Sequence, residues 1–169
     1  MGETDRDPAP VRRPRVGRAV VFALLPATWA LIFGAAPRAI GRRGPNLGWR
    51  GGKPAPVNRL GLVPLAAGAA GLGWCLSEHY APGETAPISL VPEKLIARGP
   101  YRLSRNPMYV CEQAMLLGWT VYYGSPALLA GATALGAGMR YAVSREEKTL
   151  VSRFGDSWRE YASKVPRWL

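Results

Sequence analysis

A carboxylate in the C-terminal part of the chain lies among apolar residues, where it could bind a charged ligand. Glu147 belongs to a stripe on one face of a predicted helix. The apolar members of that stripe are Leu150, Val151, Phe154, Trp158 and Tyr161. A carboxylate in such a stripe costs free energy unless it is paired or binds a ligand. Arg140 lies two turns earlier on the same face, about 10 Å along the axis. The two residues therefore either bind a ligand or anchor the helix at a membrane–water boundary.

A second group of polar residues lies in the stretch GPYRLSRNPMYV, residues 99–110. Asn106 is a good helix N-cap and Pro107 a good first helical residue, so a helix is predicted to begin there. Arg102 and Arg105 flank that start. They either anchor a membrane-spanning helix or bind an anionic group.

Three uncharged runs, residues 19–37, 60–77 and 113–139, predict helices that cross a membrane. About 20 apolar residues span the hydrocarbon core. The net charge of +11 would suit a nucleic-acid binder, but the basic residues lie almost wholly between the apolar runs. This distribution is typical of a polytopic membrane protein, and it argues against nucleic-acid binding.

The third run has two interpretations. As one helix its 27 residues would extend about 40 Å, which is long for a single span. We favour a helical hairpin over residues 107–145, because the sequence YYGSP at 122–126 predicts a turn. Glu112, about one turn into the first hairpin helix, should then face the protein interior or the membrane interface.

Together these patterns predict an all-α, polytopic membrane bundle of about four spans with a C-terminal hairpin. Residues 1–18 form a basic polar segment, and residues 19–169 form one domain. The basic loop 38–59 is not oriented by its charge, but the turn at 122–126 has no basic residue. That turn is therefore expected on the non-cytoplasmic side, and an amphipathic tail helix over 144–164 in the cytoplasm.

Metal and disulfide chemistry are not expected. The chain has one histidine, His79, and two cysteines, Cys75 and Cys111, without a CxxC motif. In the second run, Gly61, Gly68, Gly71 and Gly73 predict close packing against another helix.

An ordered set of motifs resembles the isoprenylcysteine carboxyl methyltransferases and their phospholipid N-methyltransferase relatives. The motifs are GPYRLSRNPMYV, LGW at 117–119, SP at 125–126, EE at 146–147 and FGDSWREYASKVPRW near the end. They cover about residues 85–169. Asn106 stands where the prenylcysteine enzymes usually have His, and NPMY is similar to the phosphatidylethanolamine N-methyltransferases.

The resemblance implies an integral membrane methyltransferase that uses S-adenosylmethionine. It places the cofactor site at Arg105, Asn106, Pro107, Tyr109, Glu146 and Glu147. A glutamate suits the ammonium of that cofactor, and Arg105 or Arg102 suits its carboxylate. Arg105 and Glu147 are the expected catalytic residues, and Glu112 and Arg140 the expected substrate contacts.

The acceptor is expected to be a lipid or another lipophilic molecule that enters from the bilayer. A carboxylate acceptor is already ionised, whereas an amine must lose a proton, for example to a carboxylate such as Glu112. The 18 arginines against 4 lysines are typical of a GC-rich bacterial genome, so the expected location is a bacterial inner membrane. A membrane scaffold or sensor that keeps the fold without the chemistry is the alternative.

Overall fold

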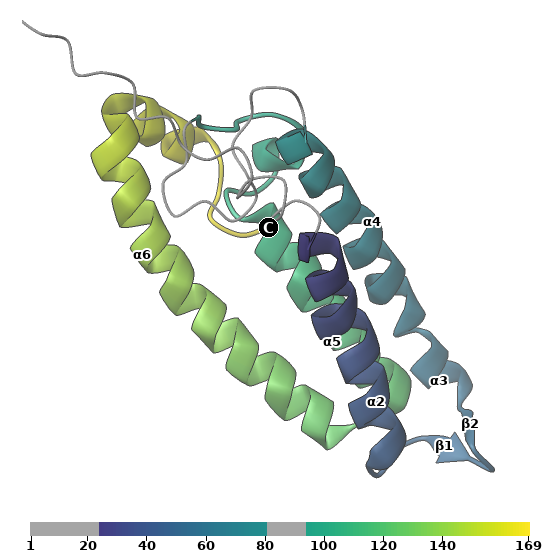
Figure 1. Ribbon diagram of the computed structural model, residues 1–169. Helices are drawn as coiled ribbons and strands as arrows, with labels where there is room; N and C mark the ends of the chain where they lie inside the picture. Colours follow the sequence, from purple (N-terminus) through teal and green to yellow (C-terminus); the bar gives the residue numbers. More distant parts are fainter. Residues whose placement is uncertain (1–23, 81–93) are drawn as a thin grey trace, which may run out of the picture.

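The computed structural model describes residues 24–80 and 94–169, which are mostly helical (Figure 1). The elements are η1 (Ala30–Ala35), α2 (Ala36–Arg43), β1 (Trp49–Arg50), β2 (Lys53–Pro54), α3 (Pro56–Arg59), α4 (Leu62–Tyr80), η2 (Gly99–Arg102), α5 (Pro107–Tyr123) and α6 (Pro126–Lys164). The predicted N-terminal segment 1–18 lies outside the described residues.

Among residues 24–80 and 94–169, two helices are long and apolar enough to cross a membrane, judged by length and composition. They are Leu24–Arg43 and Pro56–Tyr80. They correspond to the spans predicted at about 19–37 and 60–77, although the first described residue is Leu24. Spans within the hairpin stay a prediction.

The first of these helices contains a π-helical turn, η1, just before Pro37. Proline has no N–H, so the carbonyl of Phe33, four residues earlier, cannot receive its usual helical hydrogen bond. The indole Nε1 of Trp119 on α5 donates to that carbonyl instead, at 2.8 Å. A side chain from a neighbouring helix thus satisfies a backbone group that proline leaves open, as apolar surroundings require.

The loop predicted over 38–59 is smaller than expected, and it contains the one departure from an all-α fold among the described residues. α2 continues to Arg43, and β1 and β2 then pair antiparallel with Trp49 opposite Pro54. Gly51 and Gly52 connect the strands with φ values of 56° and 72°. A two-residue turn with positive φ at both positions favours Gly-Gly, which is why this sequence forms a hairpin here.

The second apolar helix packs on α5 through small residues, as predicted. A Cβ added to Gly68 would lie 2.6 Å from the backbone oxygen of Cys111, and one added to Gly61 would lie 2.4 Å from the oxygen of Gly118. Gly73 does not share this role, because a Cβ there would meet no atom within 4 Å. Glycines at the contact let the two backbones approach closely.

The predicted hairpin of the C-terminal half is confirmed. α5 ends at Gly124, whose φ of 57° is left-handed, and the hydroxyl of Ser125 accepts a hydrogen bond from the amide of Leu128 at 3.4 Å to start α6. α6 runs through the predicted tail, but non-helical angles at Gly155 (φ 51°) divide it there into two helices across a kink. α6 leans away from α5, and the chain then turns back so that the C-terminus lies beside the start of α5 (Figure 1).

Two apolar clusters hold this arrangement together. One joins Phe33 of η1 to Leu116 of α5 and Ala132 of α6. The other, at the end of α6, is formed by Trp158, Tyr161 and Val165, with partly buried members of the predicted stripe against it. The second cluster fixes the tail over the residues that precede α5.

Candidate functional site

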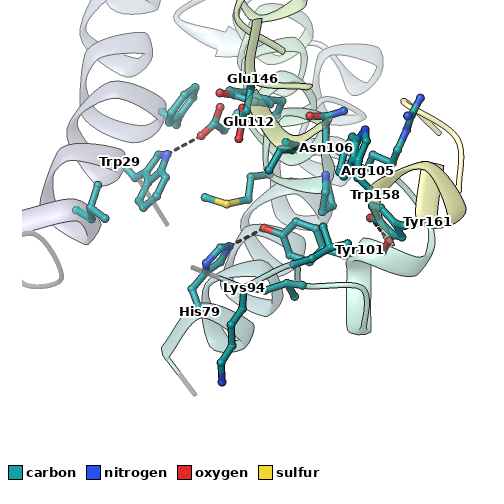
Figure 2. A pocket seen from close by; sticks show the side chains of 18 of the residues that line it. Trp29, His79, Lys94, Tyr101, Arg105, Asn106, Glu112, Glu146, Trp158 and Tyr161 are labelled. Carbon is teal, nitrogen blue, oxygen red and sulfur yellow. Dashed lines mark hydrogen bonds between the residues drawn. The ribbon is translucent and has the colours of Figure 1, made fainter. Parts of the chain in front are cut away.

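A cavity of about 410 Å³ lies at the end of the bundle where α5 begins (Figure 2). Its walls come from the N-terminal helix, the end of α4, residues 94–96, the η2–α5 junction and α6 with its tail. This volume lies within the usual range for small-molecule sites. The lining is mostly apolar, and the polar groups within it are few.

The η2–α5 junction is held by the C-terminal segment. The amide of Arg105 donates to the carbonyl of Pro166 at 2.9 Å, and the hydroxyl of Ser104 donates to the carbonyl of Arg167 at 3.1 Å. Asn106 occupies the N-cap position of α5 as predicted, but its side chain makes no cap hydrogen bond. Its Nδ2 donates to the carbonyl of Arg167 at 3.0 Å, so its side chain secures the C-terminal segment and not the helix end.

Glu147 lies beside Arg105, so the structure brings these two predicted site residues together. Their closest atoms, Oε1 and Nη1, are 3.5 Å apart. Arg167 binds the same carboxylate more closely, with Nη2 2.5 Å from Oε2 and Nε 3.2 Å from Oε1. Glu147 is therefore buried with two guanidinium partners, which satisfy its charge within the protein.

Arg105 connects this ion pair with the cavity. Its guanidinium lies over the ring of Trp158, 5.8 Å from the centroid. Its Nε is buried and has no hydrogen-bond partner among the described residues. A buried N–H without a partner costs free energy, so a ligand atom that accepts from it would be favoured.

Glu146 lines the cavity on the side of α6. The residue is exposed overall, but the cavity wall partly desolvates its carboxylate, which raises the pKa of Glu146 above the usual range. The nearby hydroxyl of Tyr109 lowers that pKa in part, and the neighbouring charge of Glu147 raises it again. Glu146 has no cationic partner among the ion pairs of the described residues.

Glu112 lies on the wall nearest the N-terminal helix. The indole Nε1 of Trp29 donates to its Oε1 at 2.6 Å (Figure 2). The residue is buried, 6 % exposed, and lines the cavity together with Trp29. Of the two positions predicted for Glu112, the protein interior and the membrane interface, the structure shows the interior.

The opposite end of the cavity is closed by aromatic residues. The hydroxyl of Tyr101 lies 2.7 Å from Nε2 of His79, and the hydroxyl of Tyr161 donates to the carbonyl of Tyr101 at 2.6 Å. Burial raises the pKa of Tyr161 to about 12, so its hydroxyl keeps its proton at neutral pH and donates. His79 is buried, and no group of three possible metal ligands occurs among the described residues.

Not every predicted site residue reaches the cavity. Arg102 and Arg140 are exposed, and neither lines it. Conversely, sequence reasoning assigned no role to Trp29, Tyr101 or Arg167. A signal was present for Tyr101 and Arg167, because they lie in the motifs GPYRLSRNPMYV and FGDSWREYASKVPRW that contributed to the resemblance.

The fold and site describe a helical protein with two candidate membrane spans and a partly polar cavity at one end of the bundle. Comparison with known protein families matches residues 73–157, half of the chain, to "Phospholipid methyltransferase". The chain belongs to the phospholipid methyltransferase family. The predicted resemblance to these enzymes is thereby confirmed. The family and the two apolar helices together indicate membrane association.

One curated relative is similar over part of the chain. An uncharacterized protein of Haemophilus influenzae is 36% identical over 63 residues, which cover 37% of this chain and 100% of that protein. No solved structure matches the chain. Trp29 and Arg167 both lie outside the residues that the family comparison matches.

Proposed function

We propose that this protein is an integral membrane methyltransferase that uses S-adenosylmethionine to methylate a lipophilic acceptor. The observation that carries the proposal is the pair of unmatched polar groups on one cavity. Within the described part of the chain, Arg105 offers a buried N–H without a partner, and Glu146 offers a carboxylate without a cation. A ligand that carries both a carboxylate and an ammonium would satisfy the two groups.

The charges of the residues that line the cavity are complementary to those of the cofactor. Its carboxylate would accept from Arg105, and its ammonium would pair with Glu146, in charge-assisted hydrogen bonds. The resemblance allowed either glutamate for the ammonium. Glu146 is the better candidate, because Glu147 already has two arginine partners. Bound S-adenosylmethionine supplies an electrophilic methyl group on a sulfonium.

The protein's own contribution is alignment of the reactants and exclusion of water. Trp158 and Tyr161 wall the cavity beside Arg105, and Trp29 and Phe33 wall it on the side of the N-terminal helix. The apolar wall from that helix suits an acceptor that enters from the bilayer. We place the cavity and the C-terminus on the cytoplasmic side of a bacterial inner membrane, with the hairpin adding two spans to the two candidate helices.

Glu112 would act as a general base towards an amine acceptor. The indole of Trp29 holds one of its oxygens, and no hydrogen bond occupies the other among the described residues. A lipid amine must lose a proton before it attacks the methyl group, and Glu112 lies where it would receive that proton. A carboxylate acceptor would not need this step, so N-methylation requires Glu112 and O-methylation does not.

Measurements of cofactor binding and of methyl transfer test the proposal separately. Calorimetric titration of the purified protein in detergent with S-adenosylmethionine should give saturable heat, with folding confirmed by circular dichroism. Incubation of membranes with methyl-labelled S-adenosylmethionine should then give a labelled lipophilic product. Absence of saturable binding by the folded protein would refute the proposal. Binding without transfer to any membrane component would instead favour the non-catalytic scaffold.

A further inference from the structure

We propose that Arg167 is a positioning residue, which neutralises Glu147 so that Arg105 stays available to a ligand carboxylate. This inference rests on the proposed function, because it concerns the same cavity. It assigns a role to the C-terminal segment, residues 165–169, which lies beyond the part of the chain matched to the family.

The cluster of Arg105, Arg167 and Glu147 contains more positive than negative charge. Two guanidinium groups, Arg105 and Arg167, face the single carboxylate of Glu147. The cluster therefore has one positive charge more than it needs. Arg167 makes the two closer contacts, at 2.5 and 3.2 Å, whereas Arg105 is 3.5 Å away. The excess charge thus resides on Arg105, which also lines the cavity.

Burial strengthens the electrostatic interactions among these groups. The side chains of Glu147 and Arg105 are 12 % and 15 % exposed. Water screens a pair this buried only weakly, so an arginine will compete strongly for the carboxylate. Without Arg167, Glu147 would keep one partner only, and Arg105 would be drawn into a closer pair with it. The guanidinium would then be neutralised before a ligand arrives.

The C-terminal segment is built to hold Arg167 in place. Its backbone accepts hydrogen bonds from the amide of Arg105 and from the side chains of Ser104 and Asn106. Val165 packs in the apolar cluster with Trp158. These contacts fix the segment independently of the ion pair, so replacing the Arg167 side chain should not release it.

Other cations nearby do not replace Arg167. Lys148 and Arg159 line the same outer cleft beside Glu147, but both are exposed. Arg159 pairs with Asp156 at 2.5 Å. Among the described residues neither forms an ion pair with Glu147, whereas Arg167, which is itself 44 % exposed, donates two hydrogen bonds to it.

The test measures how strongly the protein discriminates a carboxylate. Dissociation constants for S-adenosylmethionine and for its decarboxylated analogue are compared by calorimetry. We expect the wild type to bind S-adenosylmethionine about tenfold more tightly or better, as a charge-assisted hydrogen bond predicts. In Arg167→Ala this ratio should fall severalfold. In the double variant Glu147→Gln with Arg167→Ala the ratio should return to the wild-type value, because no carboxylate then competes for Arg105.

A matched control separates the ion pair from net charge. Arg159→Gln removes a positive charge from the same cleft, and it should leave the ratio unchanged. Arg167→Lys keeps the charge but not the two-pronged contact, so its ratio should be intermediate. This conservative variant also carries the test if Arg167→Ala does not fold.

The outcomes distinguish this inference from the proposed function. If the wild type binds neither compound, the proposed function fails. If it binds both and discriminates, but the folded Arg167 variants keep the full ratio, Arg167 has only a structural role. A ratio that falls in Arg167→Ala and stays low in the double variant would also overturn the inference.

Discussion

The indole Nε1 of Trp29 donates to Oε1 of Glu112 at 2.6 Å, across 83 residues of sequence. The bond joins the first apolar helix to α5 at the wall of the cavity (Figure 2). It anchors one oxygen of a buried carboxylate that lines the cavity. The same contact joins two helices of the bundle and, in the proposed function, holds the carboxylate that would act on the acceptor.

Glu112→Gln should impair methyl transfer to the acceptor without weakening cofactor binding. Because Glu112 contacts Trp29 and not Arg105, the affinity for S-adenosylmethionine should stay within about twofold of wild type. Methyl transfer to an amine acceptor should fall by roughly 10²–10⁴-fold, the usual contribution of a general base. Transfer to a carboxylate acceptor should be little affected. Single-turnover assays with both acceptor types measure this, and an equal loss with both would contradict the assigned role.

Glu146→Gln should weaken cofactor binding and change its dependence on pH. The raised pKa of Glu146 means that the carboxylate gains its proton at a higher pH than usual as the solution is acidified. The pair with the ammonium is then lost, so wild-type affinity should fall in the mildly acidic range. In the variant the affinity should be about tenfold lower and nearly flat with pH. Calorimetry across pH tests this.

A control lies further along α6. Glu160 is exposed, pairs with Lys164 at 2.6 Å and does not line the cavity, so Glu160→Gln should bind as the wild type does. The raised pKa of Glu146 also predicts a gain in stability. Its ionised form is disfavoured in the folded state at neutral pH, and glutamine removes that cost. A destabilised Glu146→Gln variant would count against this account.

Trp119→Phe should destabilise the bundle by about 1–3 kcal/mol, because the carbonyl of Phe33 would lose the donor that substitutes for Pro37. In the Pro37→Ala background an N–H is restored within the helix, so the same substitution should cost less. Thermal or denaturant unfolding in detergent provides the four values of the cycle. Equal costs in both backgrounds would show that the indole bond is not a replacement for the missing N–H.

Gly68→Ala should destabilise the contact between the second apolar helix and α5 by about 1–3 kcal/mol, because its methyl group would overlap the backbone of Cys111. Gly73→Ala is the matched control on the same helix. Its methyl group meets no atom within 4 Å, and alanine favours a helix by about 1 kcal/mol over glycine. Unfolding in detergent measures both, and similar losses would contradict the packing described here.

The sequence by itself determined the elements of this protein. The uncharged runs indicated the apolar helices, and YYGSP indicated the turn of the hairpin, because hydropathy and turn residues act locally. The ordered motifs indicated the family, and they brought Arg105, Glu146 and Glu147 into one predicted site. These signals lie within short stretches, so no contact between distant segments was needed to recognise them.

Only the tertiary structure decided how those residues share their roles. Asn106 was expected to cap α5, yet its amide holds the carbonyl of Arg167. Glu147 was expected either to bind a ligand or to anchor the helix, and the structure pairs it with Arg105 and Arg167, whereas Glu146 has no ion pair among the described residues. The reason is that a charged side chain pairs with whichever oppositely charged group the fold brings closest to it. The return of the C-terminus to the start of α5 is set by packing between distant segments, which no local pattern in the sequence records.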